Sequence, residues 1–173
     1  MPKSVRSASK TRSAAHPTRS SRQYWLVKSE PEEFSFDDLI ASPDGTTCWD
    51  GVRSYAARIH LRAMKAGDLV LFYHSSVDPS AVVGVAEVVR ESYPDHTACD
   101  RKHPHFDPKS KPDEPTWFMV DLRAVRPLDR AVTLDEIKRT KGLEKMALLR
   151  IGRLSVQPVT PREYEIVTRL AAR

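Results

Sequence analysis

The sequence predicts an α+β domain built around a small, mixed or antiparallel β-barrel that is flanked by helices. Stretches rich in Val, Leu and aromatic residues alternate irregularly with helical patterns of modest length, and the regular alternation that builds a large parallel sheet is missing. Hydrophobic residues make up 40% of the 173-residue chain. This content is enough for one ordinary globular domain with its own core.

The first 22 residues differ from the rest of the chain in charge and hydrophobicity. They hold six of the 28 basic residues and no acidic residue. Since they have too few apolar side chains to offset the entropy lost on ordering, we expect residues 1–22 to form a disordered basic tail and residues 23–173 to fold. The folded part carries 22 basic and 23 acidic residues. The tail is either a solubilising extension or an arm that contacts phosphates without reading a base.

Local patterns predict the elements of the first third of the domain. A β-prone run at residues 24–27 is followed by Ser-Glu-Pro, which ends a strand. Ser35 can cap a short helix whose first turn is acidic. Residues 52–64 place apolar side chains at helical spacing between arginines, which indicates an amphipathic helix that ends before Gly67.

Three further strands are expected at residues 68–74, 81–89 and 116–126, because each stretch is dense in Val, Leu or aromatic residues and is bounded by Pro, Gly or Ser. Residues 93–115 contain five prolines and many charges, so they predict a long loop.

Two capping patterns predict helices near the carboxyl end of the chain. Thr133 and Glu136 form a capping box. Thr160 and Glu163 repeat it, with Pro161 at the first helical position.

Composition also bears on location. No apolar run approaches the roughly 20 residues of a membrane span, and the first 22 residues contain nothing like the apolar core of a signal peptide. We therefore expect no contact with membranes and a cytoplasmic location, or a nuclear one in a eukaryotic cell. Cys48 and Cys99 are then expected to remain reduced thiols.

Four polar clusters lie at the ends of predicted elements, where side chains can converge on one pocket. They are residues 28–31, 49–53, 73–75 and 153–156. Trp49 is the leading candidate, because a pocket for a nucleobase needs an aromatic stacking wall and a few fixed hydrogen-bonding groups. The alternative is a tryptophan of the core.

Catalytic signals are weak. His74, beside Ser75, could act as a general base, but a histidine at a strand end more often makes structural hydrogen bonds. The chain has no GxSxG elbow, no phosphate-binding loop and no dinucleotide fingerprint, and Cys48 lacks a catalytic context. We expect no enzyme and no cofactor.

The residues His96, Cys99, His103 and His105 are of the types that bind zinc. Structural zinc sites draw two ligands from each of two elements, whereas these four lie in one proline-rich loop. We therefore expect a mobile polar loop and no metal site.

Five arginines could contact phosphates. Arg53, Arg58 and Arg62 lie towards one side of the predicted helix, and Arg150 and Arg153 form a second basic pair. They either form solvated surfaces or hold the phosphates that flank a flipped nucleotide.

At these clusters the sequence resembles the EVE domain family, relatives of PUA-like folds and of the YTH readers of methylated adenine. The resemblance covers residues 24–170 and rests on motifs that occur in order. These are YWLVKSEP (24–31), WDGVR (49–53), AR (57–58), MKAGD (64–68), LFYHS (71–75), VVGVAEV (82–88), YPD (93–95) and RLSVQPVT (153–160). The resemblance implies a PUA-like barrel whose central cavity accepts a base, with a role in recognising modified cytosine or adenine in DNA, or modified RNA.

The resemblance also implies which residues form the site. The cavity would be lined or bordered by Lys28, Trp49, Tyr73, His74, Ser75, Arg153 and Ser155. The family usually reads WDGVRNYxARN, and here Ser54 and Ile59 replace the two asparagines. We add Ser54 to the base pocket, with a narrower hydrogen-bonding repertoire than asparagine, and assign phosphate binding to Arg53, Arg58 and Arg153.

The sequence therefore predicts a non-catalytic reader that binds nucleic acid, DNA rather than RNA, and takes a modified base into an aromatic-walled pocket. Three alternatives stay open: an RNA-binding PUA-like module in translation or RNA modification, a base-processing hydrolase that uses His74, and a sensor of free nucleotides.

Overall fold

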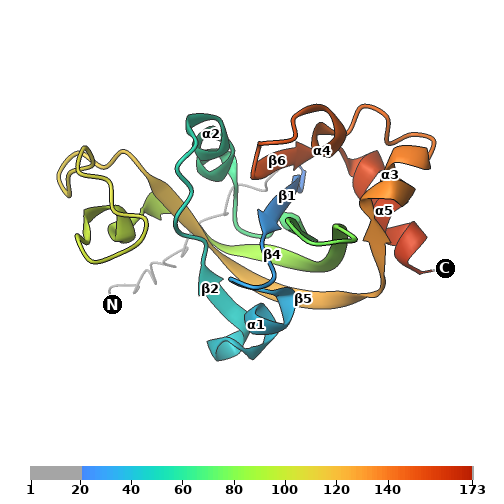
Figure 1. Cartoon of the computed structure of the whole chain (residues 1–173), viewed down its shortest axis with the longest axis horizontal. Helices are drawn as coiled ribbons and strands as arrows, with labels where there is room; N and C mark the ends of the chain where they lie inside the picture. The colour runs from blue at the N-terminus through green and yellow to red at the C-terminus, as the bar shows by residue number, and fades with distance from the viewer. Residues whose placement is uncertain (1–20, 173) are drawn as a thin grey trace, which may run out of the picture.

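The computed structural model describes residues 21–172 and shows an α+β fold (Figure 1). The strands are β1 (Tyr24–Ser29), β2 (Thr46–Cys48), β3 (Leu69–His74), β4 (Ala81–Pro94), β5 (Phe118–Thr133) and β6 (Val156–Val159). The helices are α1 (Phe36–Ala41), α2 (Tyr55–Ala63), α3 (Leu134–Arg139), α4 (Ala147–Arg150) and α5 (Pro161–Ala171), with 3-10 turns η1 (Pro43–Gly45) and η2 (His96–Cys99). Residues 1–20 of the predicted tail lie outside the described residues.

The strands form one six-stranded sheet in the order β2-β5-β4-β3-β1-β6. Strands β1 and β3 are parallel, and the other neighbouring pairs are antiparallel. The long strands β4 and β5 run across the molecule, with the 95–117 loop at one end and α3 and α5 at the other (Figure 1). Their pairing shifts register at four points, and such bulges bend a sheet.

The α+β class and the mixed sheet predicted from the sequence are confirmed. The two edge strands, β2 and β6, are not hydrogen-bonded to each other, so the sheet is bent but open. Strand β2 has three residues and β6 has four, which leaves few backbone groups to close a ladder.

Apolar side chains are buried on both faces of the central strands. Trp25 and Val70 belong to one core cluster, whereas their neighbours Leu26 and Leu71 belong to a second. Successive side chains of a strand point to opposite faces. This arrangement explains the uninterrupted apolar runs in β1 and β3, which a strand with one solvated face would not have.

The predicted N-cap of α1 at Ser35 and the predicted capping patterns of α3 and α5 are confirmed, and α1 also has a full capping box. Helix α2 begins at Tyr55, later than predicted, because Ser54 is its N-cap and accepts a hydrogen bond from the Ala57 amide at 3.3 Å. The sequence missed β2, β6 and α4, and β4 and β5 extend beyond their predicted ends. Within residues 21–172, no helix has both the length and the apolar character needed to cross a membrane.

Candidate functional site

A cavity of about 770 Å³ opens where the ends of β1 and β3 meet the loop that follows β2. Because β1 and β3 are parallel neighbours, their carboxyl ends lie side by side. The lining residues are Lys28, Ser29, Glu30, Glu33, Phe34, Thr47, Cys48, Trp49, Asp50, Gly51, Val52, Arg53, Ser75, His103, Pro104, His105 and Ser155. Each of the four polar clusters predicted from the sequence contributes at least one of them. The volume is in the range of small-molecule sites.

One rim of the cavity is held together by bonds between strand ends. The backbone amide of Lys28 donates to the Ser155 carbonyl at 2.9 Å, and the Ser75 amide donates to the Ser29 carbonyl at 2.9 Å. The Lys28 Nζ donates to the Gly152 carbonyl at 2.6 Å. Partial burial lowers the pKa of the Lys28 amine. This rim is therefore formed by predicted pocket residues from three separate stretches of the chain.

Trp49 is among the residues that line the cavity and is also part of the core. Its exposed fraction is 9%. The indole packs edge-on against Phe72, with ring centroids 5.4 Å apart, and against Phe34, at 6.3 Å. The Trp49 amide donates to the Val120 carbonyl at 2.7 Å. Trp49 is therefore a core residue, and its role as a stacking wall for a base stays a prediction.

The loop that follows Trp49 is fixed by a buried carboxylate. Asp95 accepts from the Gly51 amide at 2.9 Å, from Arg53 Nη1 at 2.8 Å, and from the amide and hydroxyl of Thr97 at 2.9 and 2.6 Å. Its side chain is fully buried. Burial alone would raise the pKa of Asp95, but the hydrogen bonds from Arg53, Thr97 and Gly51 outweigh it, and the pKa is lowered.

Arg53 is occupied by the same loop contacts. Besides Asp95, its guanidinium donates to the Val52 carbonyl, to the Thr97 hydroxyl and twice to the His105 carbonyl. These bonds match the five N–H groups of a guanidinium. Arg53 therefore connects the loop that follows β2 to the loop that follows β4. A phosphate could bind its guanidinium only by displacing one of these partners.

The other two predicted phosphate-binding residues differ from each other. Arg58 Nη1 donates to the Thr116 carbonyl at 2.7 Å, and its guanidinium stacks over the rings of Tyr55 and Trp117. Arg153 is exposed and does not line the cavity. The guanidinium groups of Arg53 and Arg58 lie beside the same ring, 5.7 and 5.8 Å from the Trp117 centroid, and both donate to protein carbonyl groups.

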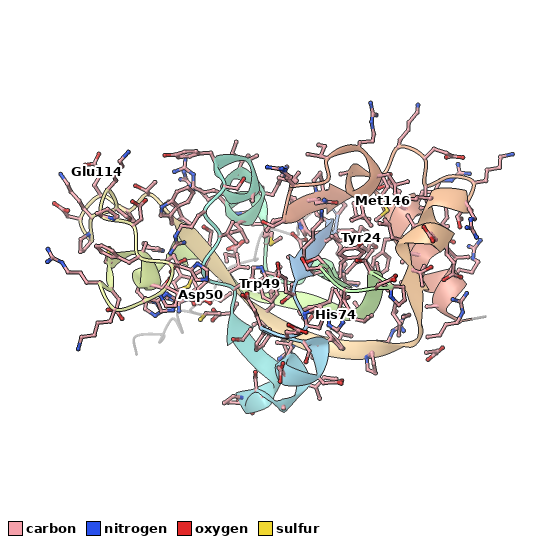
Figure 2. All side chains as sticks on the ribbon, in the orientation of Figure 1. Tyr24, Trp49, Asp50, His74, Glu114 and Met146 are labelled. Atoms are coloured by element: carbon pink, nitrogen blue, oxygen red, sulfur yellow. The ribbon has the colours of Figure 1, made fainter. Side chains whose placement is uncertain are left out.

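Three predicted pocket residues lie outside the lining. His74 Nε2 accepts from the Phe36 amide at 3.1 Å, which is a structural bond, and burial lowers the pKa of this histidine against the opposing charge of Asp37. Tyr73 is buried in the second core cluster. Ser54 caps α2. Figure 2 shows His74 apart from Trp49 and Asp50.

Sequence reasoning did not single out Asp50, His103, His105 and Cys48 as pocket residues. Asp50 lies between Trp49 and the loop that follows β4 (Figure 2). Its Oδ2 is 3.8 Å from His103 Nε2, and His103 Nδ1 accepts from the His105 amide at 3.1 Å. The signal for Asp50 was present, since it belongs to the 49–53 cluster, whereas the histidines were considered only as zinc ligands.

Two further properties concern metal and thiol chemistry. No three His, Cys, Asp or Glu side chains gather as a metal site within residues 21–172. Burial, followed by the charges of Asp50 and Asp121, raises the pKa of the Cys48 thiol. A raised pKa keeps the thiol protonated and makes it a poor nucleophile.

The fold and the sequence are similar to those of known proteins. A sequence model of the EVE domain matches residues 23–170. Thymocyte nuclear protein 1 of Mus musculus is 46% identical over 164 residues, which cover 85% of this chain and 73% of the mouse protein. A hypothetical protein from Leishmania major has a solved structure with a TM-score of 0.84 at 49% identity, covering 88% of this chain and 96% of that one.

The human THYN1 protein, solved in complex with DNA that contains 5-methylcytosine, also has a TM-score of 0.84, at 43% identity, covering 87% of this chain and 98% of that one. A more distant similarity, at 13% identity and a TM-score of 0.51 over 90% of this chain and 87% of the other, is to the YTH domain of the Zygosaccharomyces rouxii MRB1 protein. It bears on the fold alone and agrees with the predicted PUA-like class.

Proposed function

Since the chain belongs to the EVE domain family, we propose that it binds DNA and reads one modified base, 5-methylcytosine, by taking it into the cavity beside Trp49. The observation that carries the proposal is a cavity of about 770 Å³ whose lining includes Trp49 and polar residues at strand ends. A flat base needs such a stacking face and a few fixed polar groups. The human relative in complex with DNA containing 5-methylcytosine supports this choice of ligand.

We propose binding without catalysis. The strongest enzymatic candidate, His74, uses its Nε2 as acceptor for a backbone amide and does not line the cavity. The Cys48 thiol does line it, but its raised pKa disfavours the thiolate. In a eukaryotic cell we propose a nuclear location, which fits DNA as the partner and the name of the mouse relative. The cytoplasmic alternative gains no support from the relatives.

Trp49→Phe tests the stacking role. The structure argues against the alanine variant, because removing a buried indole from the contacts with Phe34 and Phe72 should cost about 3–5 kcal/mol of stability. Phenylalanine keeps an aromatic ring but gives a smaller face. Since stacking of a base contributes roughly 1–3 kcal/mol, we expect the affinity for a 5-methylcytosine oligonucleotide to fall several-fold, within a limit of about 150-fold.

The measurement is fluorescence anisotropy at one fixed salt concentration, with single- and double-stranded oligonucleotides that carry 5-methylcytosine or cytosine at one position. The matched control is Trp25→Phe, since Trp25 is buried but does not line the cavity. Equal affinities of the Trp49 and Trp25 variants would contradict the role of Trp49. RNA of the same sequence separates the RNA-binding alternative, because only RNA offers the 2′-hydroxyl. If free nucleosides bind as tightly as the oligonucleotides, the result would favour the alternative in which the protein is a sensor of free nucleotides.

A further inference from the structure

The cavity wall contains a partly buried carboxylate with unused acceptor capacity. The Asp50 side chain is 32% exposed, and its nearest ion-pair partner, His103 Nε2, is 3.8 Å away, which is longer than a hydrogen bond. No hydrogen bond to this carboxylate occurs among residues 21–172. Glu30 and Glu33, the other two carboxylates among the lining residues, are exposed. Asp50 is therefore the acidic group best shielded from water inside the cavity.

The backbone on both sides holds Asp50 in place. The amide of Trp49 donates to the Val120 carbonyl at 2.7 Å, and the amide of Gly51 donates to Asp95 Oδ2 at 2.9 Å. Gly51 has a φ of +78°, a conformation that favours glycine. The backbone of Asp50 follows directly after Trp49 and is anchored on both sides to other parts of the chain. A group fixed in this way loses little conformational freedom when a ligand binds.

A reader of 5-methylcytosine must reject thymine, and neither stacking nor a slot for a methyl group can do so. Both bases are flat pyrimidines with a methyl group at position 5. They differ at position 4, where 5-methylcytosine has an amino group and thymine a carbonyl oxygen, and at N3, which accepts in the first and donates in the second. A carboxylate is an acceptor and has no hydrogen to donate. A carboxylate therefore accepts a hydrogen bond from the amino group of 5-methylcytosine. Opposite thymine, the carboxylate oxygen and the carbonyl oxygen are both acceptors, and neither has a donor.

We propose that Asp50 is the specificity-determining residue that accepts a hydrogen bond from the amino group of the bound base and thereby excludes thymine. The inference rests on the proposed function and adds the selection of amino-bearing pyrimidines to it. His103 Nδ1 accepts from the His105 amide at 3.1 Å, and Nε2 lies 3.8 Å from Asp50 Oδ2.

Asp50→Asn tests the inference with almost no change in shape. An amide can turn its NH₂ group towards the thymine carbonyl or its oxygen towards the cytosine amino group, so it accepts both bases. The probes are DNA oligonucleotides of one sequence with 5-methylcytosine, cytosine or thymine at the central position. A good side-chain pair with a base edge contributes about 5- to 150-fold of discrimination. We expect the wild-type preference for 5-methylcytosine over thymine to fall at least about fivefold in the variant.

The matched control is Asp129→Asn, the same chemical change at an exposed residue that does not line the cavity, which should keep the wild-type preference. If the wild type prefers 5-methylcytosine to cytosine and Asp50→Asn retains its full preference over thymine, Asp50 is not the selector, although the proposed function stands. If the wild type does not separate 5-methylcytosine from cytosine, the proposed function fails and the inference with it. Should the asparagine variant not fold, as judged by circular dichroism, Asp50→Ser gives the same comparison.

Discussion

Replacing Asp95 by asparagine would remove the charge at the centre of the contacts that hold the 49–53 loop. Asp95 Oδ2 accepts from the Gly51 amide and from Arg53, and Oδ1 accepts from the amide and hydroxyl of Thr97. The best orientation of an asparagine keeps its oxygen towards Gly51 and Arg53 and turns its NH₂ towards Thr97. The Thr97 hydroxyl can rotate to accept, but the Thr97 amide then faces a donor and loses its partner.

The loss can be assigned a magnitude. A buried donor without a partner costs about 1–3 kcal/mol. The bond from Arg53 also weakens, because hydrogen bonds to charged groups contribute about 1.5–3 kcal/mol and neutral ones about 1 kcal/mol. Asp95→Asn should therefore lower the free energy of unfolding by about 2–4 kcal/mol. Asp95→Ala should cost about 3–5 kcal/mol, because it leaves the Arg53 cation without its counter-charge.

Urea unfolding, followed by tryptophan fluorescence at neutral pH, measures this change. The control is Glu165→Gln, which breaks the exposed pair with Arg169 and should change the free energy of unfolding by less than about 1 kcal/mol. A shift for Asp95→Asn as small as that of the control would refute the reasoning, because it would mean that the four bonds seen at Asp95 contribute nothing net.

Two further variants test the loop and the strand end. Gly51→Ala should destabilise the protein by about 1–3 kcal/mol and displace His105, because φ is +78° and the new Cβ would lie 2.7 Å from the His105 ring; thermal melting measures it against Gly152→Ala, whose Cβ meets nothing within 4 Å. For His74, burial lowers the pKa from the ordinary 6.5, so the unfolded chain binds the proton more readily and stability is lost as pH falls below about 6.5. His74→Asn should flatten the urea-unfolding profile between about pH 7.5 and 5, though not abolish it, because burial also lowers the pKa of His60; an unchanged slope would contradict this account.

The elements predicted correctly are those whose signals are local. Thr133 and Glu136 form a capping box whose two hydrogen bonds connect residues three apart, so the sequence alone contains the whole motif. Strand β2 was not predicted, because its three residues, Thr46–Cys48, are too few to show the alternation of apolar and polar side chains that identifies a strand. Its place in the sheet comes from pairing with β5, more than 70 residues later, which no local pattern records.

The candidate site was predictable as a convergence of element ends, and less so in the roles of its residues. The sequence placed Arg53 in a cluster near the pocket and on one side of a predicted helix. Its ion-pair partner Asp95 lies 42 residues further along the chain, in a segment predicted to be the start of a mobile loop. Arg53 therefore looked free for a phosphate, whereas the fold engages every N–H group of its guanidinium. Likewise, the bond from the Phe36 amide gives His74 a structural role that its position at a strand end could not distinguish from a catalytic one.

In the proposed complex, the residues that select the base differ from those that supply most of the affinity for DNA. Extruding a base costs a few kcal/mol, and one stacking face contributes only about 1–3 kcal/mol, so the cavity by itself yields little net binding. Since Arg53 and Arg58 already have protein partners, we expect the affinity of the proposed complex to come from basic side chains that are exposed. We expect these at the end of α4 and in the turn that follows it, because Arg150 and Arg153 are exposed and the Gly152 carbonyl between them accepts a hydrogen bond from Lys28 at the rim of the cavity. Phosphate contacts at such a turn would strengthen binding to any DNA equally, which leaves the choice of base to the rigid loop that carries Trp49.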